Sequence, residues 1–288
     1  MSDPPDGIPF SLRFDGLDAT NHQLDMRLLG RTLIGVDRVV SDAVILGATG
    51  RTATAKDRRE LTILISAPRA ACVELPGLIA TAGGLLPIIT ETLKHPGPKY
   101  VFEFLSFLLK HNGGKPKEAE VHLMKALDLA FEDRQHERET FFENEADWRA
   151  HSLALAALLT KPLREMVAPL GPSAETLTIQ GAGVDQTTVI DVPMAEALRS
   201  NEALEVGDMN SYRVKIDGLI KHSRQLKVEL LSDVGIFVNA EVRDPAFDTL
   251  PNIYTKALDA DGVLIVQAKP TYRSGTLHKL HIMDASEA

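Results

Sequence analysis

Hydrophobic and polar residues alternate most regularly at the C-terminal end of the chain, between Tyr212 and Asp284. Val214 and Ile216, for example, alternate with Arg213 and Lys215. A period of two predicts strands that each bury one face only. The pattern predicts three strands, a short helix and two further strands, at residues 212–216, 226–230, 236–242, 253–258, 263–268 and 280–282. This order is typical of an OB-type barrel, a scaffold that serves binding more often than catalysis.

The residue pattern of the N-terminal part of the chain predicts an α+β domain, which we call the body. Residues 9–14 form a predicted strand, and apolar residues at helical spacing predict a long amphipathic helix over about 24–45. Two further strands, 61–66 and 71–75, are expected to pair with the first strand and to pack against this helix. Strands are also predicted at 175–180 and 187–191, with a helix from Pro193 to about Ser200. The polar stretch 201–210 marks a boundary between an α+β body, 1–207, and an OB-like barrel, 208–288.

A helical insertion is predicted within the body, over about 78–169. It opens with two apolar runs, 78–93 and 100–109. A membrane-spanning helix needs about 20 apolar residues, and the first run is shorter and contains Gly83, Gly84 and Pro87. The pattern therefore favours buried core helices, with a surface for oligomerisation or triggered membrane insertion as the alternative. The charged segment 115–149 predicts a solvated helical projection, and helix is expected again at 148–167, bent at Pro162.

Composition is that of an ordinary globular protein, with 44% apolar and 25% charged residues. The net charge of −9 lies upstream of residue 210, because the rest of the chain carries ten Lys/Arg and ten Asp/Glu. An acidic body disfavours non-specific binding to phosphate backbones. The lone cysteine, Cys72, excludes an internal disulfide and a multi-cysteine zinc site. The acidic, Pro-rich start shows no secretory signal, so we expect a cytoplasmic protein.

One glycine motif deserves comparison with known nucleotide-binding turns. Residues 44–52 read Val-Ile-Leu-Gly-Ala-Thr-Gly-Arg-Thr, which resembles the phosphate-binding turn of atypical short-chain dehydrogenases and NmrA-like proteins. Such a turn follows a buried strand and precedes a helix, whereas these residues continue a helical period. The pattern favours a helix C-terminus that Gly47 or Gly50 stops.

No set of residues predicts catalysis, a metal site or a cofactor. Glu132, His136, Glu139 and Glu143 would share one helix face, but that face carries no core residues and is better explained as solvated. No serine lies in a Gly-flanked elbow of the hydrolase type. The acids that would serve an unrecognised nuclease or nucleotide-processing site are Asp15, Asp18 and Asp25.

The predicted barrel offers a partner-binding face instead. If Ile236 and Val238 are core residues, Phe237 faces outward, where Arg213, Lys215 and Lys227 are possible neighbours. Together with Tyr272, these residues could bind single-stranded nucleic acid through stacking and cationic contacts. Docking of a protein partner on the same face is the alternative.

Three short segments resemble a bacterial family of two-domain proteins to which no activity is assigned. They are 14–18 (Phe-Asp-Gly-Leu-Asp), 29–35 (Leu-Gly-Arg-Thr-Leu-Ile-Gly) and 252–258 (Asn-Ile-Tyr-Thr-Lys-Ala-Leu). The resemblance implies a bacterial origin.

The leading hypothesis is a non-enzymatic binding protein that self-associates through its N-terminal body and recognises a protein or nucleic acid through its barrel. The alternatives are a membrane-acting effector that uses residues 78–109 and a nuclease or nucleotide-processing enzyme.

Overall fold

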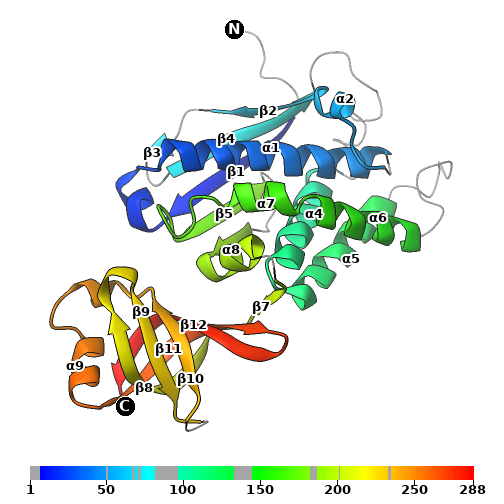
Figure 1. Cartoon of the computed structure of the whole chain (residues 1–288). Helices are drawn as coiled ribbons and strands as arrows, with labels where there is room; N and C mark the ends of the chain where they lie inside the picture. Colours follow the sequence, from blue (N-terminus) through cyan, green and yellow to red (C-terminus); the bar gives the residue numbers. More distant parts are fainter. Residues whose placement is uncertain are drawn as a thin grey trace. The chain divides into compact units, whose positions relative to one another are not determined.

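The computed structural model shows two compact units, Met1–Arg199 and Ser200–Ala288. We call them the N-terminal domain and the C-terminal barrel, and each is described by itself (Figure 1). The residues that the structure describes are 7–49, 51–66, 69–70, 73–81, 97–132, 145–181, 187–200, 202–232 and 235–288.

An antiparallel sheet with the strand order β2-β4-β1-β5-β6 forms the framework of the N-terminal domain. Its central strand, β1, buries Phe10, Leu12 and Phe14 on one face and exposes the residues between them. Strand side chains alternate between the two sides of a sheet, so these three residues point to the same side. That side packs against the helices. The strands are β1 (Gly7–Asp15), β2 (Leu61–Ile65), β3 (Arg69–Ala70), β4 (Val73–Thr81), β5 (Thr176–Gly181) and β6 (Thr187–Asp191).

Helices cover the buried face of this sheet (Figure 1). The longest, α1, begins where the Asp25 carboxylate accepts hydrogen bonds from the backbone N–H groups of Arg27 and Leu28, at 2.8 and 3.0 Å. Val36, Val40 and Val44 of α1 are buried at helical spacing. The helices are α1 (Met26–Thr49), α2 (Ala55–Arg58), α4 (Gly97–Asn112), α5 (Pro116–Glu132), α6 (Glu145–Leu158), α7 (Thr160–Met166) and α8 (Val192–Arg199).

Aromatic side chains fill the space between α4 and α6. Tyr100, Phe104 and Phe107 of α4 are buried, and the Trp148 ring of α6 lies edge-on to Phe104 with centroids 5.7 Å apart. The apolar run 100–109 is therefore a buried core helix, as expected. The expectation of helix from residue 78 is wrong for 78–81, which end β4 and pair with both β1 and β2. The rest of the first run, 82–96, lies outside the described residues.

The charged helix α5 has one solvent-exposed side and one buried side. Ala119, Leu123 and Leu127 are buried against the core, and the charged residues that predicted a solvated segment occupy the other side. A buried polar pair joins α5 to α4: the His122 Nδ1 atom lies 2.6 Å from a carboxylate oxygen of Glu103, which is only 5% exposed. Residues 133–144, which include most of the Glu/His face considered above, lie outside the described residues.

The glycine motif at 44–52 belongs to a helix end and its following loop. α1 continues through Gly47 to Thr49, so Gly47 does not stop the helix. A Cβ atom at Gly47 would collide with the buried ring of Tyr100, so the close approach of α1 to α4 requires glycine there. After the helix, Arg58 forms an ion pair with Asp42, a buried residue of α1. The turn of this motif thus follows a helix, whereas the phosphate-binding turn that it resembles follows a buried strand.

The C-terminal barrel is closed by five strands. β8, β9 and β10 pair as an antiparallel meander, β10 pairs in parallel with β12, and β11 joins β12 to β8. α9 lies between β10 and β11 in the chain, so the predicted order of three strands, a helix and two strands is confirmed. The elements are β7 (Leu204–Val206), β8 (Asn210–Ile220), β9 (Gln225–Leu230), β10 (Phe237–Val242), α9 (Ile253–Asp259), β11 (Val263–Arg273) and β12 (Thr276–Glu287).

Alternate residues of each barrel strand form one interior core. Val214, Val228 and Val266 are fully buried, and Phe247 and Tyr254 close the core from the segment around α9. The Tyr254 hydroxyl donates a hydrogen bond of 2.8 Å to the Asp244 carboxylate. β7 pairs with β11, so residues 204–206 belong to the barrel.

The buried pair of Glu103 and His122 generates a stability prediction. We expect His122→Ala to lower the free energy of unfolding of the N-terminal domain by about 2–4 kcal/mol, because it leaves a buried carboxylate without its partner. The only tryptophan, Trp148, is buried in this domain, so tryptophan fluorescence during urea denaturation of the whole chain follows it. The double variant Glu103→Leu/His122→Ala should be more stable than His122→Ala alone. Equal stability of His122→Ala and wild type would contradict the assigned role.

Candidate partner-binding face of the barrel

The outer surface of β9 and β10 carries a regular grid of polar side chains. The side chains of Leu226, Val228, Val238 and Ala240 are buried, so the residues between them point outward. The strand register pairs the outward residues Gln225 with Glu241, Lys227 with Asn239, and Glu229 with Phe237. We call these six residues the β9–β10 face.

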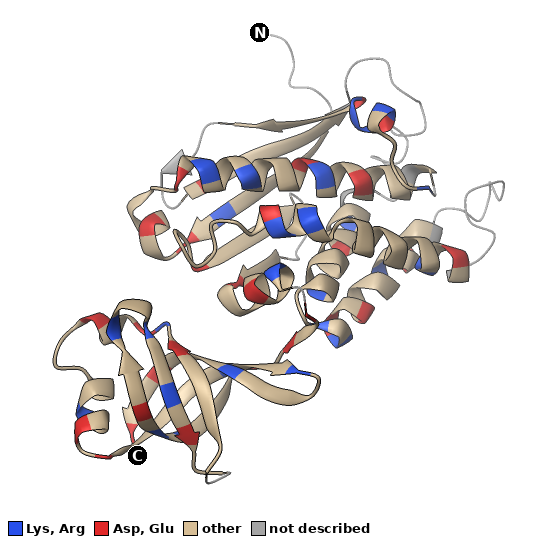
Figure 2. Cartoon of the chain, in the orientation of Figure 1, with Lys and Arg blue, Asp and Glu red and all other residues tan. Residues whose placement is uncertain are grey.

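The grid continues onto the strands on either side. Lys227 lies opposite Gly218 of β8, and Asn239 lies opposite Lys279 of β12. Two polar side chains of the face are therefore flanked by a glycine on one side and a lysine on the other. Figure 2 shows basic and acidic residues interspersed over the barrel strands rather than gathered into one basic patch.

Phe237 and Lys227 contact each other within this face. Phe237 is 47% exposed, and the Lys227 ammonium lies 4.6 Å from the centre of its ring. A cation–π contact of this kind at an exposed site contributes about 0.5–1 kcal/mol. The same ammonium lies 3.0 Å from the Asp217 carboxylate. Lys227 is thus held between the carboxylate and the ring, and it restrains an apolar ring that still faces solvent.

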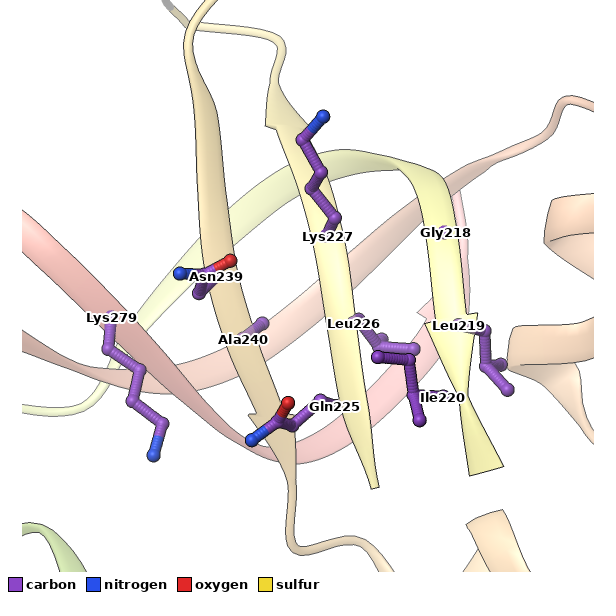
Figure 3. A pocket seen from close by; sticks show the side chains of 9 residues that line it. All are labelled: Gly218, Leu219, Ile220, Gln225, Leu226, Lys227, Asn239, Ala240 and Lys279. Carbon is purple, nitrogen blue, oxygen red and sulfur yellow. The ribbon is translucent and has the colours of Figure 1, made fainter. Parts of the chain in front are cut away.

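A surface hollow of about 340 Å³ lies beside this pair (Figure 3). Gly218 is one of its lining residues, and a Cβ atom there would meet nothing within 4 Å, so this position borders open space. The strand pairing slips between Ile216 and Gly218, so Asp217 is the extra residue of a β-bulge. The lining residues come from β8, β9, β10 and β12: Gly218, Leu219, Ile220, Gln225, Leu226, Lys227, Asn239, Ala240 and Lys279.

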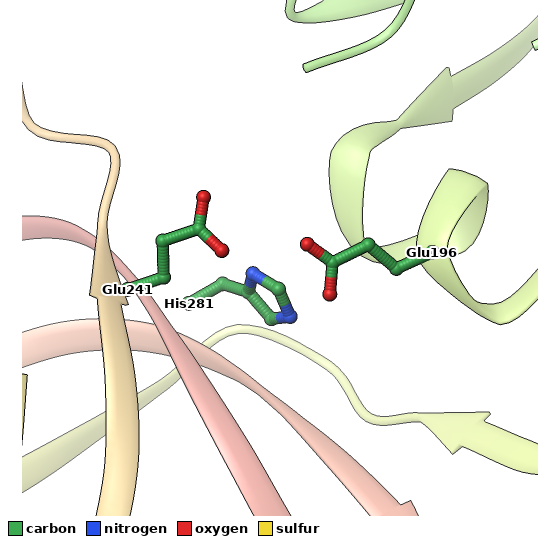
Figure 4. A group of neighbouring side chains, drawn as sticks. All are labelled: Glu196, Glu241 and His281. Atoms are coloured by element: carbon green, nitrogen blue, oxygen red, sulfur yellow. The ribbon is translucent and has the colours of Figure 1, made fainter. Parts of the chain in front are cut away.

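An ion-pair cluster borders the hollow on the β10–β12 side. Glu241 forms ion pairs with Lys279 and Arg243, and the ring of His281 lies beside its carboxylate (Figure 4). Burial by itself would raise the pKa of Glu241, but the hydrogen bond from Lys279 and the charges of Arg243, Lys279 and His281 together lower it. Glu241 therefore stays ionised at neutral pH and neutralises much of the charge of Lys279.

The structure brings together only some of the residues predicted for partner binding. Phe237 and Lys227 are in contact. Lys215 lies opposite Glu229 in the same row as Phe237, with its ammonium 2.7 Å from the Asp261 carboxylate. Arg213 is exposed further along β8.

Tyr272 lies apart from this group. It sits on β11 opposite Glu205 of β7, and β11 is a neighbour of neither β9 nor β10. Its side chain is hydrogen-bonded to Tyr212. Tyr272 is therefore not part of the β9–β10 face.

The prediction missed residues that the strand register makes part of the site. Asn239 and Gln225 share the outward alternation of Phe237 and Lys227, so the same pattern could have identified them. Lys279 joins the face only through the parallel pairing of β10 with β12, which no local pattern reveals. Gly218 matters because of the bulge beside it, and the alternation of β8 gives no signal for that bulge.

Two of the three acids considered for a nuclease site have structural roles. Asp15 forms an ion pair with Arg13 at 2.9 Å, and Asp25 caps α1. Within the described part of the chain, Asp15, Asp18 and Asp25 do not converge as a group that could hold a metal ion. Among the described helices, none is both long and apolar enough to cross a membrane.

The fold and the face define a two-domain protein that joins an α+β domain to a closed OB-like barrel. The chain belongs to the family described as "Domain of unknown function (DUF7946)", which it matches over residues 10–199. Residues 208–286 match a second description, "Family of unknown function (DUF7947)". The expected two-domain family is thereby confirmed. No curated protein and no solved structure matches the chain.

The contact between Tyr212 and Tyr272 generates a prediction about titration. Burial, the negative charge of an ionised Tyr272 and the hydrogen bond between the two side chains raise the pKa of Tyr212 to about 12. We expect Tyr272→Phe to lower this pKa toward the ordinary tyrosine value of about 10, with burial retaining part of the shift. Ultraviolet absorbance of tyrosinate measures the change, and Tyr212→Phe identifies which titration belongs to Tyr212.

The sign of the linked stability change follows from the raised pKa. Below about pH 10, Tyr212 is neutral whether the barrel is folded or unfolded. Between that pH and about 12, only the unfolded chain ionises, so the stability from this group falls as the pH rises. An unchanged Tyr212 titration in Tyr272→Phe would show that the two side chains are not coupled.

Proposed function

We propose that this chain is a non-enzymatic binding protein of the bacterial cytoplasm that recognises a partner through the β9–β10 face. The single observation that carries the proposal is Phe237, an aromatic ring that is 47% exposed and restrained by Lys227. Exposed aromatic side chains beside polar hollows are typical of binding surfaces. β9 and β10 are the second and third strands of the barrel, and OB-type barrels bind ligands on the face formed by these strands.

The charges on this face support binding rather than catalysis. A general acid or base works best with a pKa near the operating pH, whereas the pKa of Glu241 is lowered away from neutrality. Lys227 and Lys279 are each paired with a carboxylate, at Asp217 and Glu241 respectively. These pairs hold the side chains in fixed positions, which suits a surface that orients a ligand.

The second part of the proposal is self-association through the N-terminal domain. Within the described part of the sheet, β6 pairs only with β5 and is therefore an edge strand. Its central residue, Val189, is 50% exposed. An edge strand presents unpaired backbone groups that can hydrogen-bond to a second copy of the same strand. These features support an interface between two N-terminal domains along β6.

The membrane-acting alternative finds no support in the described residues of its segment. The apolar side chains of α4, among them Tyr100, Phe104 and Leu108, are buried in the core. Their insertion into a bilayer would first require α4 to leave the domain. We therefore do not extend the proposal to a membrane.

Partner binding generates a test with a matched control. Tagged full-length protein is incubated with a lysate of the source organism, and captured proteins and nucleic acids are quantified. We expect Phe237→Ala to reduce recovery of a specific partner by about tenfold or more, because truncating a central aromatic residue removes much of a binding interface. Met209→Ala is the control, because Met209 is similarly exposed at 44% but lies outside the β9–β10 face. Equal recovery with wild type and Phe237→Ala would contradict the proposal.

Self-association generates a second test. Light scattering of the purified chain is expected to give the mass of a dimer, and Val189→Lys should give a monomer because a charge on an edge strand opposes pairing. Leu64→Lys is the matched control: Leu64 is 44% exposed and lies on β2, at the opposite edge of the described sheet. A monomeric wild-type chain at all concentrations, or a dimer that survives Val189→Lys, would count against an interface along β6.

A further inference from the structure

We infer that α6 presents an apolar face that pairs, in antiparallel orientation, with α6 of a second copy of this chain. This contact is a second self-interface, separate from the one proposed along β6. It involves neither the sheet edge nor the barrel, so it goes beyond both parts of the proposed function.

Helix α6 is apolar on its exposed side as well as on its buried side. Residues 150–160 contain no Asp, Glu, Lys or Arg. Trp148 and Leu155 are buried in the core, whereas Leu153 is 41% exposed and Leu158 is 68% exposed. A helix on the surface normally carries polar side chains on its solvent side, and an exposed apolar face is typical of an interface. We call its five exposed apolar residues the α6 face: Ala150, Leu153, Ala154, Ala157 and Leu158.

The α6 face is one continuous strip along the helix. Ala150, Ala154 and Ala157 follow one another at spacings of four and three, so they lie on the same side. At 100° per residue, Leu153 and Leu158 lie on either side of this row. Alanine side chains allow two helix axes to approach to about 8 Å, and the flanking leucines can then pack against the second helix.

A basic residue continues the strip past the end of α6. The backbone N–H of Leu163 donates a hydrogen bond of 2.9 Å to the carbonyl of Leu159, so helical geometry persists beyond Leu158. Lys161 comes four positions after Ala157 and is exposed on the same side. The strip is therefore bounded by a carboxylate, Asp147, at its N-terminal end and by an ammonium group at its C-terminal end.

These two charges identify a second copy as the occupant. An antiparallel pair with its two-fold axis at Ala154 places Asp147 of each copy opposite Lys161 of the other. Such self-complementarity is what a two-fold interface requires. A parallel pair would place like charges together and align the two helix dipoles. A helix that lies on a membrane surface carries several basic residues beside its apolar face, whereas this strip carries one charge of each sign.

The size of the contact makes it weak. The strip from Asp147 to Lys161 is about 21 Å long, and one pair of helices of this length buries less than the roughly 1,200 Å² of a stable interface. Pairing through α6 is therefore expected at higher concentrations than pairing through β6. Because each domain would carry two different two-fold interfaces, the α6 contact joins dimers into tetramers or longer chains.

Sedimentation equilibrium of the full-length chain over a range of concentrations tests the contact. We expect the average mass to rise above that of a dimer as the concentration increases. Leu158→Glu should raise the concentration that this step requires by about tenfold or more, because it places a charge within the apolar contact of both copies. Ile236→Glu is the matched control, since Ile236 is 53% exposed but lies in the barrel.

Charge reversal tests the antiparallel register. Asp147→Lys and Lys161→Asp each place like charges opposite one another, and each should weaken the association by about 2- to 30-fold because two exposed ion pairs are lost. The double variant Asp147→Lys/Lys161→Asp restores both pairs with reversed sign and should associate as wild type. Recovery would show self-pairing, because a different partner would not carry the reversed charges. Ala154→Cys should also form a disulfide-linked dimer on oxidation, unlike Lys125→Cys on the exposed side of α5.

The outcomes separate this contact from the interface along β6. The inference is overturned if the wild-type chain stays monomeric throughout, if Leu158→Glu associates as wild type, or if the double charge variant associates no better than the single variants. If the association that remains in Val189→Lys is lost on adding Leu158→Glu, the α6 contact stands whether or not β6 forms a dimer. If Leu158→Glu leaves self-association unchanged but prevents capture of a different protein from a lysate, the α6 face serves another partner and the inference is wrong.

Discussion

Closure of the C-terminal sheet is the constraint on which the binding face depends. When β11 joins β12 to β8, each of the five closing strands has a neighbour on both sides, and alternate side chains must fill one small interior. Val228 and Val238 take interior positions, so Lys227, Phe237 and Asn239 have only the outside left. The face is therefore a consequence of core packing. A shift of β10 by one residue would place Asn239 and Glu241 in the core and Val238 and Val242 in solvent, which the cost of burying polar and charged groups strongly opposes.

The local charge balance decides what kind of recognition this face permits. The segment from residue 210 onward is neutral, and both lysines that line the hollow have a carboxylate partner. Exposed charges more than about 8 Å apart are largely screened at physiological salt, so a neutral surface attracts a ligand only weakly over distance. Selectivity must then come from short-range contacts with the ring of Phe237 and the carboxamides of Asn239 and Gln225. The acidic excess upstream adds no attraction for a polyanion.

The sequence was sufficient to predict features that depend on local periodicity. The barrel strands, α1 and the outward direction of Phe237 all follow from alternation or helical spacing. Features that depend on distant pairing were not predictable: Lys279 reaches the hollow through β12, and residues 78–81 are a strand because they pair with β1 and β2. The helix end predicted at Gly47 or Gly50 was confirmed, because α1 ends at Thr49, but the sequence could not show that Gly47 lies inside the helix to admit the ring of Tyr100. The hollow depends on a bulge whose position the alternation of β8 does not reveal.

The two domains use their aromatic residues in different ways, and this difference indicates which domain has a surface suited to binding. In the N-terminal domain, the aromatic residues of α4 pack against Trp148 in the interior, so the segment that looked available for a membrane or an oligomer interface is already used for folding. In the barrel, Phe247 and Tyr254 are likewise buried, but Phe237 is not. An aromatic ring left in water gains nothing from the hydrophobic effect until something covers it. Its placement beside a hollow that Gly218 lines is therefore the strongest argument that β9 and β10 recognise a partner.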